Sequence, residues 1–454
     1  MKFRFSWINS RKSLIFASLF DFSLFYYLFF EKFSYPILNE LILIFLSVIN
    51  SLIWVISSYI FGRYAFKSNG KLKILITQFS KTLLIIFLNL IFTQIIFRIF
   101  WNWNYMNFES FSNYLNYLTI LYSRIFIISW LTQSLLSSYF SKKYSKVSIW
   151  LFLGNKNRAE YLKKLIGNKS KYKIKFFSKK YLINNDLKAK GTIIDDEEIL
   201  EKKKIQFLFD LNNSGMKFMK ISNWCERYLN RYPSELIKVN DIISGKFSYD
   251  ENSLKARIKR ICEFLLSILI LILTLPIIVF SSFLIKLEDG GPVFYSQIRN
   301  GFEGKQFKII KLRTMIIDAE KKGIQWAESS DIRITKIGKI LRKLRIDELP
   351  QLWLVVSGEM SLIGPRPERP KIDLLLRNHI PNYDLRYSIK PGISGWAQVN
   401  YPYGASINDS KLKLSYDIYY IKNFSILLDC MIFLQTIKLV LSGKGSVPLR
   451  NSLN

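Results

Sequence analysis

The chain has 454 residues, of which 50% are hydrophobic and 16% aromatic, and its 66 lysines and arginines against 34 acids give a formal net charge of +32. This charge implies an anionic partner, either nucleic acid, anionic lipid or a phosphorylated substrate, and the apolar content favours the membrane. With one histidine, His379, and three scattered cysteines, histidine-based metal sites and Ser-His-Asp triads are nearly excluded, and neither a zinc site nor a disulfide framework is supported.

Four apolar stretches come first, near Ser13–Phe30, Ile37–Phe61, Thr77–Phe100 and Leu115–Phe140. Each is long enough to cross about 30 Å of hydrocarbon, which takes roughly 20 helical residues. The first has no cleavage motif, so we do not expect a signal peptide. Lysines and arginines flank both ends of the set, whereas the two opposite loops have few cations. By the positive-inside rule, we expect a four-span bundle with both ends in the cytoplasm.

Two charged residues, Asp21 and Arg124, fall inside the first and the fourth of these stretches. Each would cost roughly 3 kcal/mol if it stayed unpaired in the membrane. We expect the two to pair near the midplane. The alternative is that each faces another polar partner or water.

Residues 145–245 alternate strand-like runs with helical patterns, which is typical of a Rossmann-like α/β domain. The strand-like runs are Val147–Asn155, Tyr172–Phe177, Gly191–Asp195 and Ile205–Asp210. Gly154 stands alone where a dinucleotide-binding loop needs three glycines. A structural or regulatory role is therefore favoured over nucleotide binding.

A fifth apolar run spans Ile261–Ile285 and is long enough to cross the membrane. Pro276 lies well inside it, where proline removes a backbone hydrogen bond and kinks a helix. A crossing would also place the rest of the chain outside the cell, away from cytosolic nucleotides and metal. We therefore expect a re-entrant helix that breaks near Thr274–Pro276 and returns; a simple span is the alternative.

Near the end of the chain, Ser425–Leu441 is expected to be an interfacial helix, or else a core helix.

An acid pair, Asp347-Glu348, follows a strongly cationic stretch and precedes the proline-stiffened loop Gly364–Pro367. This combination suits chemistry on a phosphate ester. The cations hold the anionic substrate, one carboxylate holds a metal ion, and the other attacks phosphorus. We expect Asp347 to cap a helix with Pro350 in its first turn, where the dipole would favour a phosphate and keep the carboxylate ionised. The alternative is that Asp347 only caps the helix and Glu348 only balances the cations.

Three basic residues near the acid pair are candidates for phosphate binding. Lys311 and Arg313 alternate with apolar residues in the run Phe307–Met315, so we expect them to share one face of an extended segment. A solvated basic strand is the alternative. Arg342, in a basic amphipathic helix expected over Ile337–Leu344, lies five residues before Asp347.

The ordered motifs of residues 257–446 resemble those of the bacterial sugar transferases, the monotopic polyprenyl-phosphate phosphoglycosyltransferases. The motifs are Gly291–Gln297, Lys311–Met315, Asp331–Thr335, Asp347–Gln351, Met360–Pro367, Lys390–Asn400 and Tyr416–Tyr420. The segments in front resemble those of long-form members that initiate exopolysaccharide or O-antigen synthesis. Among the departures, Glu263 stands where the family usually has aspartate.

The resemblance implies a mechanism. Asp347 would attack the β-phosphate of a UDP-sugar, release UMP and keep the phosphosugar until polyprenyl (undecaprenyl) phosphate accepts it from the bilayer. Glu348, with Asp347 beside it, would bind Mg²⁺. The residues implied in phosphate or substrate binding are Arg342, Arg366, Arg313, Lys311 and, as a polar partner, Asp417.

We therefore expect a membrane protein in three parts: a four-helix transmembrane bundle (1–144), a Rossmann-like α/β domain (145–245) and an α/β-type monotopic phosphoglycosyltransferase domain (255–446) with a re-entrant helix at 261–285. It would lie in the bacterial inner membrane, with the catalytic domain in the cytosol, and initiate a surface polysaccharide (exopolysaccharide, O antigen or capsule). A non-catalytic scaffold or regulator of polysaccharide export is the alternative. Nucleic acid is not an expected partner, and the sugar, the pathway and a possible homo-oligomer are left open.

Overall fold

The computed structural model describes residues 7–8, 11–33, 40–65, 70–100, 108–145, 147–167, 172–176, 189–195, 217–319, 331–401, 404 and 406–443. The chain forms two compact units that divide between Phe218 and Met219.

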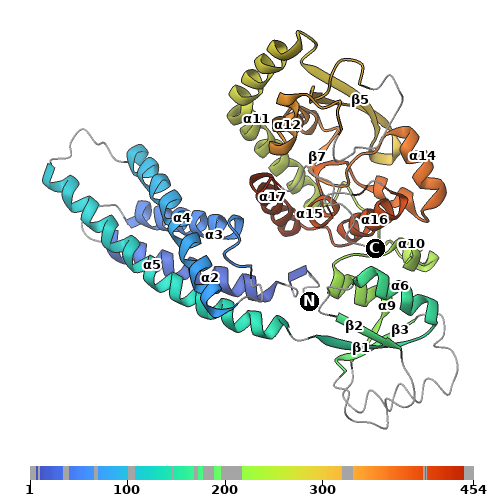
Figure 1. Cartoon of the computed structure of the whole chain (residues 1–454), viewed down its shortest axis with the longest axis horizontal. Helices are drawn as coiled ribbons and strands as arrows, with labels where there is room; N and C mark the ends of the chain where they lie inside the picture. The colour runs from blue at the N-terminus through green and yellow to red at the C-terminus, as the bar shows by residue number, and fades with distance from the viewer. Residues whose placement is uncertain are drawn as a thin grey trace. The chain divides into compact units, whose positions relative to one another are not determined.

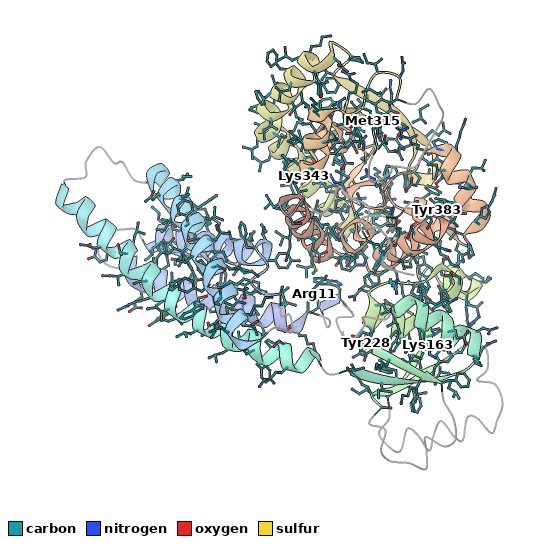
Figure 2. All side chains as sticks on the ribbon, viewed as in Figure 1. Arg11, Lys163, Tyr228, Met315, Lys343 and Tyr383 are labelled. Atoms are coloured by element: carbon teal, nitrogen blue, oxygen red, sulfur yellow. The ribbon has the colours of Figure 1, made fainter. Side chains whose placement is uncertain are left out.

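Four long apolar helices dominate the first unit (Figure 1). They are α2 (Lys12–Phe33), α3 (Glu40–Ile60), α4 (Lys71–Phe100) and α5 (Phe108–Ser145). Helices α2 and α4 each pack against both α3 and α5, around a core that includes Phe25, Trp54 and Tyr122. Other apolar side chains project outward, as Figure 2 shows for the helices as a whole, and Phe87 is 62% exposed. All four helices are long and apolar enough to cross a membrane, which indicates a membrane protein.

Asp21 is buried between these helices, and its partner is Arg63, so the predicted pairing with Arg124 is wrong. Arg63 Nη1 lies 3.1 Å from Asp21 Oδ2, and both side chains are fully buried. The hydroxyls of Tyr64 and Ser129 donate to the same carboxylate at 2.9 and 2.7 Å. Arg124 is exposed. The sequence argument considered only charges inside the apolar runs, whereas Arg63 comes from the turn after α3.

We expect Asp21→Asn to destabilise this helical bundle, because it leaves the Arg63 guanidinium buried without a counter-ion. Breaking a buried ion pair costs about 3–5 kcal/mol, so the midpoint of thermal unfolding in detergent should fall. Arg124→Gln changes an exposed charge of the same bundle and should leave the midpoint unchanged. Equal losses from the two variants would contradict the assignment of Arg63 as the partner.

The described remainder of the first unit contains parallel strands and a helix. β1 (Ser148–Leu153) lies between β2 (Tyr172–Phe176) and β3 (Gly191–Ile194) and pairs in parallel with both. α6 (Lys156–Ile166) follows β1 and packs against β2, as a parallel pair joined by a helical crossover requires. The predicted strand over 205–210 lies outside the described residues.

The second unit begins at Met219, inside the range 145–245 that the sequence suggested for the α/β domain. Its first elements are β4 (Phe218–Lys220, which starts at the boundary), α9 (Ile221–Trp224), η2 (Cys225–Leu229), η3 (Ser234–Leu236) and α10 (Val239–Ile243). Glu226 accepts hydrogen bonds from Lys422 at 2.6 Å and from Asn423 at 3.0 Å, and Tyr232 N donates to the Ser415 carbonyl at 2.7 Å. These contacts attach the segment to the last third of the unit.

The rest of the second unit packs helices around two small sheets (Figure 1). β5 and β6 form an antiparallel hairpin, and β7 and β8 pair in parallel. In chain order the elements are α11 (Leu254–Asp289), β5 (Phe294–Asn300), η4 (Phe302–Gly304), β6 (Gln306–Leu312), α12 (Lys336–Leu344), η5 (Ile346–Gln351), α13 (Leu352–Ser357), β7 (Ser361–Ile363), α14 (Pro370–His379), η6 (Tyr383–Ser388), β8 (Gly392–Ser394), α15 (Trp396–Asn400), α16 (Ile407–Lys422) and α17 (Ile426–Leu441).

α11 is one α-helix with Pro276 inside it, so the predicted break between two helices near Thr274–Pro276 is wrong. Thr274 Oγ1 donates to the Ile270 carbonyl at 2.7 Å, one turn earlier. A proline together with such a hydroxyl bond bends a helix more often than it ends one.

Both ends of α11 contact the rest of the second unit, and the stretch between them is apolar and exposed. Near the start, Arg260 Nη2 donates to the Val356 carbonyl at 2.9 Å. Near the end, Ile285 packs in a cluster with Leu312 and Leu341. The exposed side chains include Leu265, Leu269, Ile272, Leu273, Val279, Phe280 and Phe283. An apolar surface of this extent on a helix indicates contact with lipid.

The C-terminal apolar run forms α17, which is half-buried rather than fully exposed. Ser425 caps its start, and Leu428 and Ile432 are fully buried in the unit, whereas Leu427 and Leu441 are exposed. One side of the helix is therefore part of the core.

Candidate active site

Asp347 and Glu348 lie on a short 3₁₀ helix, η5, which leads directly into α13. This helix begins at Ile346, and Arg345 before it has a left-handed φ of 57°, an uncommon conformation for arginine. The prediction that Asp347 caps a helix is therefore wrong, because Arg345 occupies the position before η5. Both acids are 7% exposed. The tight reversal brings them under the basic residues of neighbouring elements.

Three cations surround Glu348. Its Oε1 lies 2.6 Å from Arg366 Nη2, 3.0 Å from Lys311 Nζ and 3.3 Å from Arg345 Nη1. Burial alone would raise the pKa of Glu348, but Arg366, Lys311 and Arg345 hold it well below its usual range. Glu348 is therefore an anion that brings together three cations able to bind phosphate.

Asp347 has a different environment from its neighbour. Its Oδ1 is buried and has no hydrogen-bond partner among the described residues. Burial and the negative charge of Glu348 raise the pKa of Asp347 to about 6. The expectation that a helix terminus favours the ionised carboxylate is therefore not met. A carboxylate that is ionised at neutral pH but poorly stabilised is a competent nucleophile.

Arg366 reaches Glu348 because two backbones approach each other unusually closely. A Cβ on Gly364 would lie 2.4 Å from the Lys390 carbonyl oxygen, and one on Gly392 would lie 2.1 Å from Gly364 N. Only glycine fits at both positions. The pairing of β7 with β8 thereby fixes the start of the Gly364–Pro367 loop.

The other predicted residues lie further from Glu348. Arg313 Nη1 lies 2.7 Å from Asp289 Oδ2, at the end of α11. β6 itself ends at Leu312, although Arg313 N still donates to the Val293 carbonyl at 2.8 Å. Arg342 Nε donates to Thr314 Oγ1 at 2.8 Å, although its charge still lowers the pKa of Asp347.

Asp417 lies on α16 and is 2% exposed. Its Oδ2 is 3.5 Å from Arg386 Nη2, which also donates to the Arg366 carbonyl. Burial raises the pKa of Asp417 to about 6. Asp417 is therefore connected to the acid pair through the backbone of the Arg366 loop.

Sequence reasoning named Arg345 only within the cationic stretch before the acid pair and Arg299 only beside the Gly291–Gln297 motif, and it did not single out Lys413. The role of Arg345 depends on its positive φ, which no pattern in the sequence signals. Arg299 and Lys413 are far apart in the sequence and become neighbours of Arg366 only in the fold.

The two acids fit a magnesium ion only in combination with a substrate. Among the described residues, no three histidine, cysteine, aspartate or glutamate side chains gather into a metal site. Mg²⁺ often takes only one or two carboxylates and completes its shell with water and substrate phosphates. Asp347 and Glu348, with the unpartnered Asp347 Oδ1, would supply that partial set of ligands.

The part of the chain that contains these residues is similar to known sugar transferases. Residues 254–443 match the model of the bacterial sugar transferase family. The chain is 41% identical over 220 residues to UDP-N-acetylgalactosamine-undecaprenyl-phosphate N-acetylgalactosaminephosphotransferase of Aeromonas hydrophila, covering 46% of this chain and 52% of that protein. It is 40% identical over 189 residues to UDP-glucose:undecaprenyl-phosphate glucose-1-phosphate transferase of Klebsiella pneumoniae, covering 41% of this chain and 40% of that protein.

A third relative is shorter. The chain is 38% identical over 192 residues to the uncharacterized sugar transferase EpsL of Bacillus subtilis (strain 168), covering 41% of this chain and 89% of that protein. The chain thus spans about half the length of the Aeromonas protein and less of the Klebsiella protein, but nearly all of the Bacillus one. With this extent of similarity, the chain belongs to the bacterial sugar transferase family.

Proposed function

We propose that this protein transfers a phosphosugar from a UDP-sugar to undecaprenyl phosphate through a covalent intermediate on Asp347. The observation that carries the proposal is the contrast between the two acids. Glu348 is balanced by three cations, whereas Asp347 has a buried, unpartnered oxygen. Relatives named as undecaprenyl-phosphate sugar phosphotransferases support the same reaction class.

The proposed chemistry consists of two displacements at one phosphorus atom. In the first, an Asp347 oxygen attacks the β-phosphorus of the UDP-sugar, the bond from that phosphorus to the bridging oxygen breaks, and UMP leaves. Lys311, Arg345 and Arg366 would stabilise the charge on the phosphate oxygens. In the second displacement, a phosphate oxygen of undecaprenyl phosphate attacks the same phosphorus and frees the Asp347 carboxylate. Mg²⁺ held by Asp347 and Glu348 would supply neutralisation of the diphosphate charge.

The shape of α11 supports a re-entrant arrangement in the bacterial inner membrane, with the catalytic unit in the cytosol. A straight helix of 36 residues would be about 54 Å long, well beyond the thickness of the hydrocarbon core. Its start and its end both contact the same unit, and its exposed middle is apolar. A bend at Pro276 would let the helix enter and leave one leaflet. Undecaprenyl phosphate could then reach Asp347 from the bilayer.

The test is UMP release from a panel of UDP-sugars by the purified full-length protein, with undecaprenyl phosphate and Mg²⁺ present. UDP-glucose and UDP-N-acetylgalactosamine come first, because the two named relatives use them. UMP formation that depends on undecaprenyl phosphate would support the reaction and identify the sugar. A folded protein that releases no UMP from any of the donors would move the conclusion toward a membrane scaffold of polysaccharide export.

The activity should depend on pH through Asp347. Its pKa is raised to about 6, so the carboxyl is neutral and cannot attack below that pH and is ionised above it. We expect kcat/KM to fall tenfold for each pH unit below about 6 and to be flat between pH 7 and 8. The pKa of Asp417 is also about 6, so Asp417→Asn is the control. If the acidic limb vanished in that variant, Asp417 rather than Asp347 would be the titrating group.

A further inference from the structure

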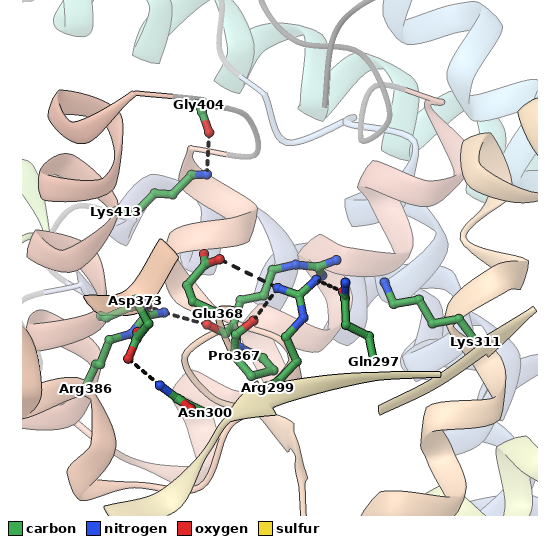
Figure 3. Close-up of polar contacts among 12 residues, drawn as sticks. Gln297, Arg299, Asn300, Lys311, Pro367, Glu368, Asp373, Arg386, Gly404 and Lys413 are labelled. Atoms are coloured by element: carbon green, nitrogen blue, oxygen red, sulfur yellow. Dashed lines mark hydrogen bonds and ion pairs between the residues drawn. The ribbon is translucent and has the colours of Figure 1, made fainter. Parts of the chain in front are cut away.

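Arg299 of β5 is a largely buried cation with incomplete partners. Its side chain is 15% exposed, and the acid paired with it, Glu368, is 3.7 Å away. Figure 3 shows the guanidinium between Glu368 and Gln297, and its Nη2 donates to Gln297 Oε1 at 2.8 Å. Arg299 Nε is buried and has no hydrogen-bond partner among the described residues. Arg299 Nη1 also donates to the Pro367 carbonyl at 3.2 Å, so Nε is the buried donor of this guanidinium that is still open to an acceptor.

Lys413 of α16 is the second such cation. Its Nζ donates to the Gly404 carbonyl at 3.0 Å (Figure 3), and no described acid lies within ion-pair distance of it. Burial lowers the pKa of Lys413. One turn later on the same helix, Asp417 has a buried Oδ1 without a partner in the described part of the chain.

Cations crowd around Arg366. Burial, together with the positive charge of Arg366, lowers the pKa of Arg299, Lys413 and Lys311, and Arg386 donates to the Arg366 carbonyl. A partly buried group of cations is costly unless anions join it. The diphosphate of a nucleotide sugar carries two negative charges.

The helix that carries Lys413 and the helix α11 have different main neighbours, although Lys259 of α11 donates to the Tyr420 hydroxyl of α16 at 2.9 Å. α11, from which the lipid acceptor would arrive, packs against η5, α12, α13 and β7. α16, which carries Lys413, packs against α14, α15 and η6. A water-soluble nucleotide can bind near α16, because it does not have to approach along α11 from the bilayer.

We propose that Arg299 and Lys413 form a second anion site, which binds the phosphate of the UMP moiety in the sugar donor and not the phosphate of the lipid acceptor. This inference rests on the proposed function. The phosphate that is transferred is then bound by Lys311, Arg345 and Arg366. The phosphate that leaves with the nucleotide is bound by Arg299 and Lys413. The two residues thereby determine affinity for the nucleotide.

The experiment uses the full-length protein in detergent and compares Lys413→Met with the wild type. Three quantities are measured: the dissociation constant of UMP by calorimetry, the KM for the UDP-sugar and the KM for undecaprenyl phosphate. We expect the first two to rise about tenfold, because a hydrogen bond between charged groups is lost, and the third to change less than twofold. Lys413→Arg should restore most of the affinity. Lys371→Met, which removes an exposed charge of α14, should behave as wild type.

Arg299→Lys offers a second route if Lys413→Met does not fold, since it keeps the charge but loses the guanidinium fork. It should also raise the UMP dissociation constant and the UDP-sugar KM. A rise in the KM for undecaprenyl phosphate with unchanged UMP binding would overturn the inference and assign the site to the acceptor. Unchanged values in both variants would also overturn it. If the wild type bound UMP more tightly than Lys413→Met but transferred no sugar, the anion site would be supported and the proposed reaction would be contradicted.

Discussion

Asp347→Asn is expected to abolish sugar-phosphate transfer, with a loss of roughly 10³-fold or more, as when other enzymes lose their nucleophile. The amide oxygen is neutral and a poor nucleophile, whereas its size matches that of the carboxylate. The contacts of Glu348 with Lys311, Arg345 and Arg366 do not involve Asp347, so the cation cluster should survive. The measurement is UMP release together with capture of labelled sugar on the protein, using a UDP-sugar labelled in the sugar and no acceptor.

Stability separates loss of chemistry from loss of fold in this variant. Because the buried Asp347 carboxylate is poorly compensated, asparagine should leave the unfolding midpoint equal or slightly higher. Glu359→Gln, a change at an exposed acid after α13, should keep full activity. Labelled sugar bound covalently to Asp347→Asn protein would show that another residue is the nucleophile.

Much of the architecture follows from local composition. The four N-terminal helices were predictable because a run of some 20 apolar residues has few alternatives to a membrane helix. The partner of Asp21 was not, because Arg63 lies in a turn whose path depends on helix packing. The start of the second unit at Met219 was hidden for a similar reason, since Glu226 reaches Lys422 only after folding.

In the candidate site too, some features were predictable from local sequence and others depend on the fold. Asp347, Glu348, Lys311 and Arg366 were predicted from motifs and are brought together by the fold. Arg313 was grouped with them by strand alternation, but its guanidinium pairs with Asp289 at the end of α11. Local patterns thus located the acids and the chain segments around them, but not the ends of strands or the backbone reversals that decide which cations reach the acids.

Lys259→Met is expected to destabilise the second unit by about 3–5 kcal/mol, the usual loss when one member of a buried charge cluster is removed. Lys259 is 5% exposed, and its Nζ lies 2.8 Å from Asp429 Oδ2 and 3.2 Å from Glu263 Oε1. It also donates to the Ile363 carbonyl at 2.8 Å. The substitution would leave two acids buried without their cation. Thermal unfolding in detergent measures the loss, and Lys255→Met, an exposed position one turn earlier on α11, is the matched control.

The same cluster connects the membrane helix to the chemistry, so the variant should also lose activity before it unfolds. Glu263 accepts from the backbone N–H groups of Leu362 and Ile363 at 3.1 and 3.3 Å, and the chain then continues into the Gly364–Pro367 loop that carries Arg366. Glu263, which lies on α11, thus holds β7 in place. Glu263→Gln should reduce transfer with a smaller loss of stability than Lys259→Met, because its amide oxygen still accepts from β7. If Lys259→Met unfolded at the same temperature as Lys255→Met, α11 would not anchor the site in this way.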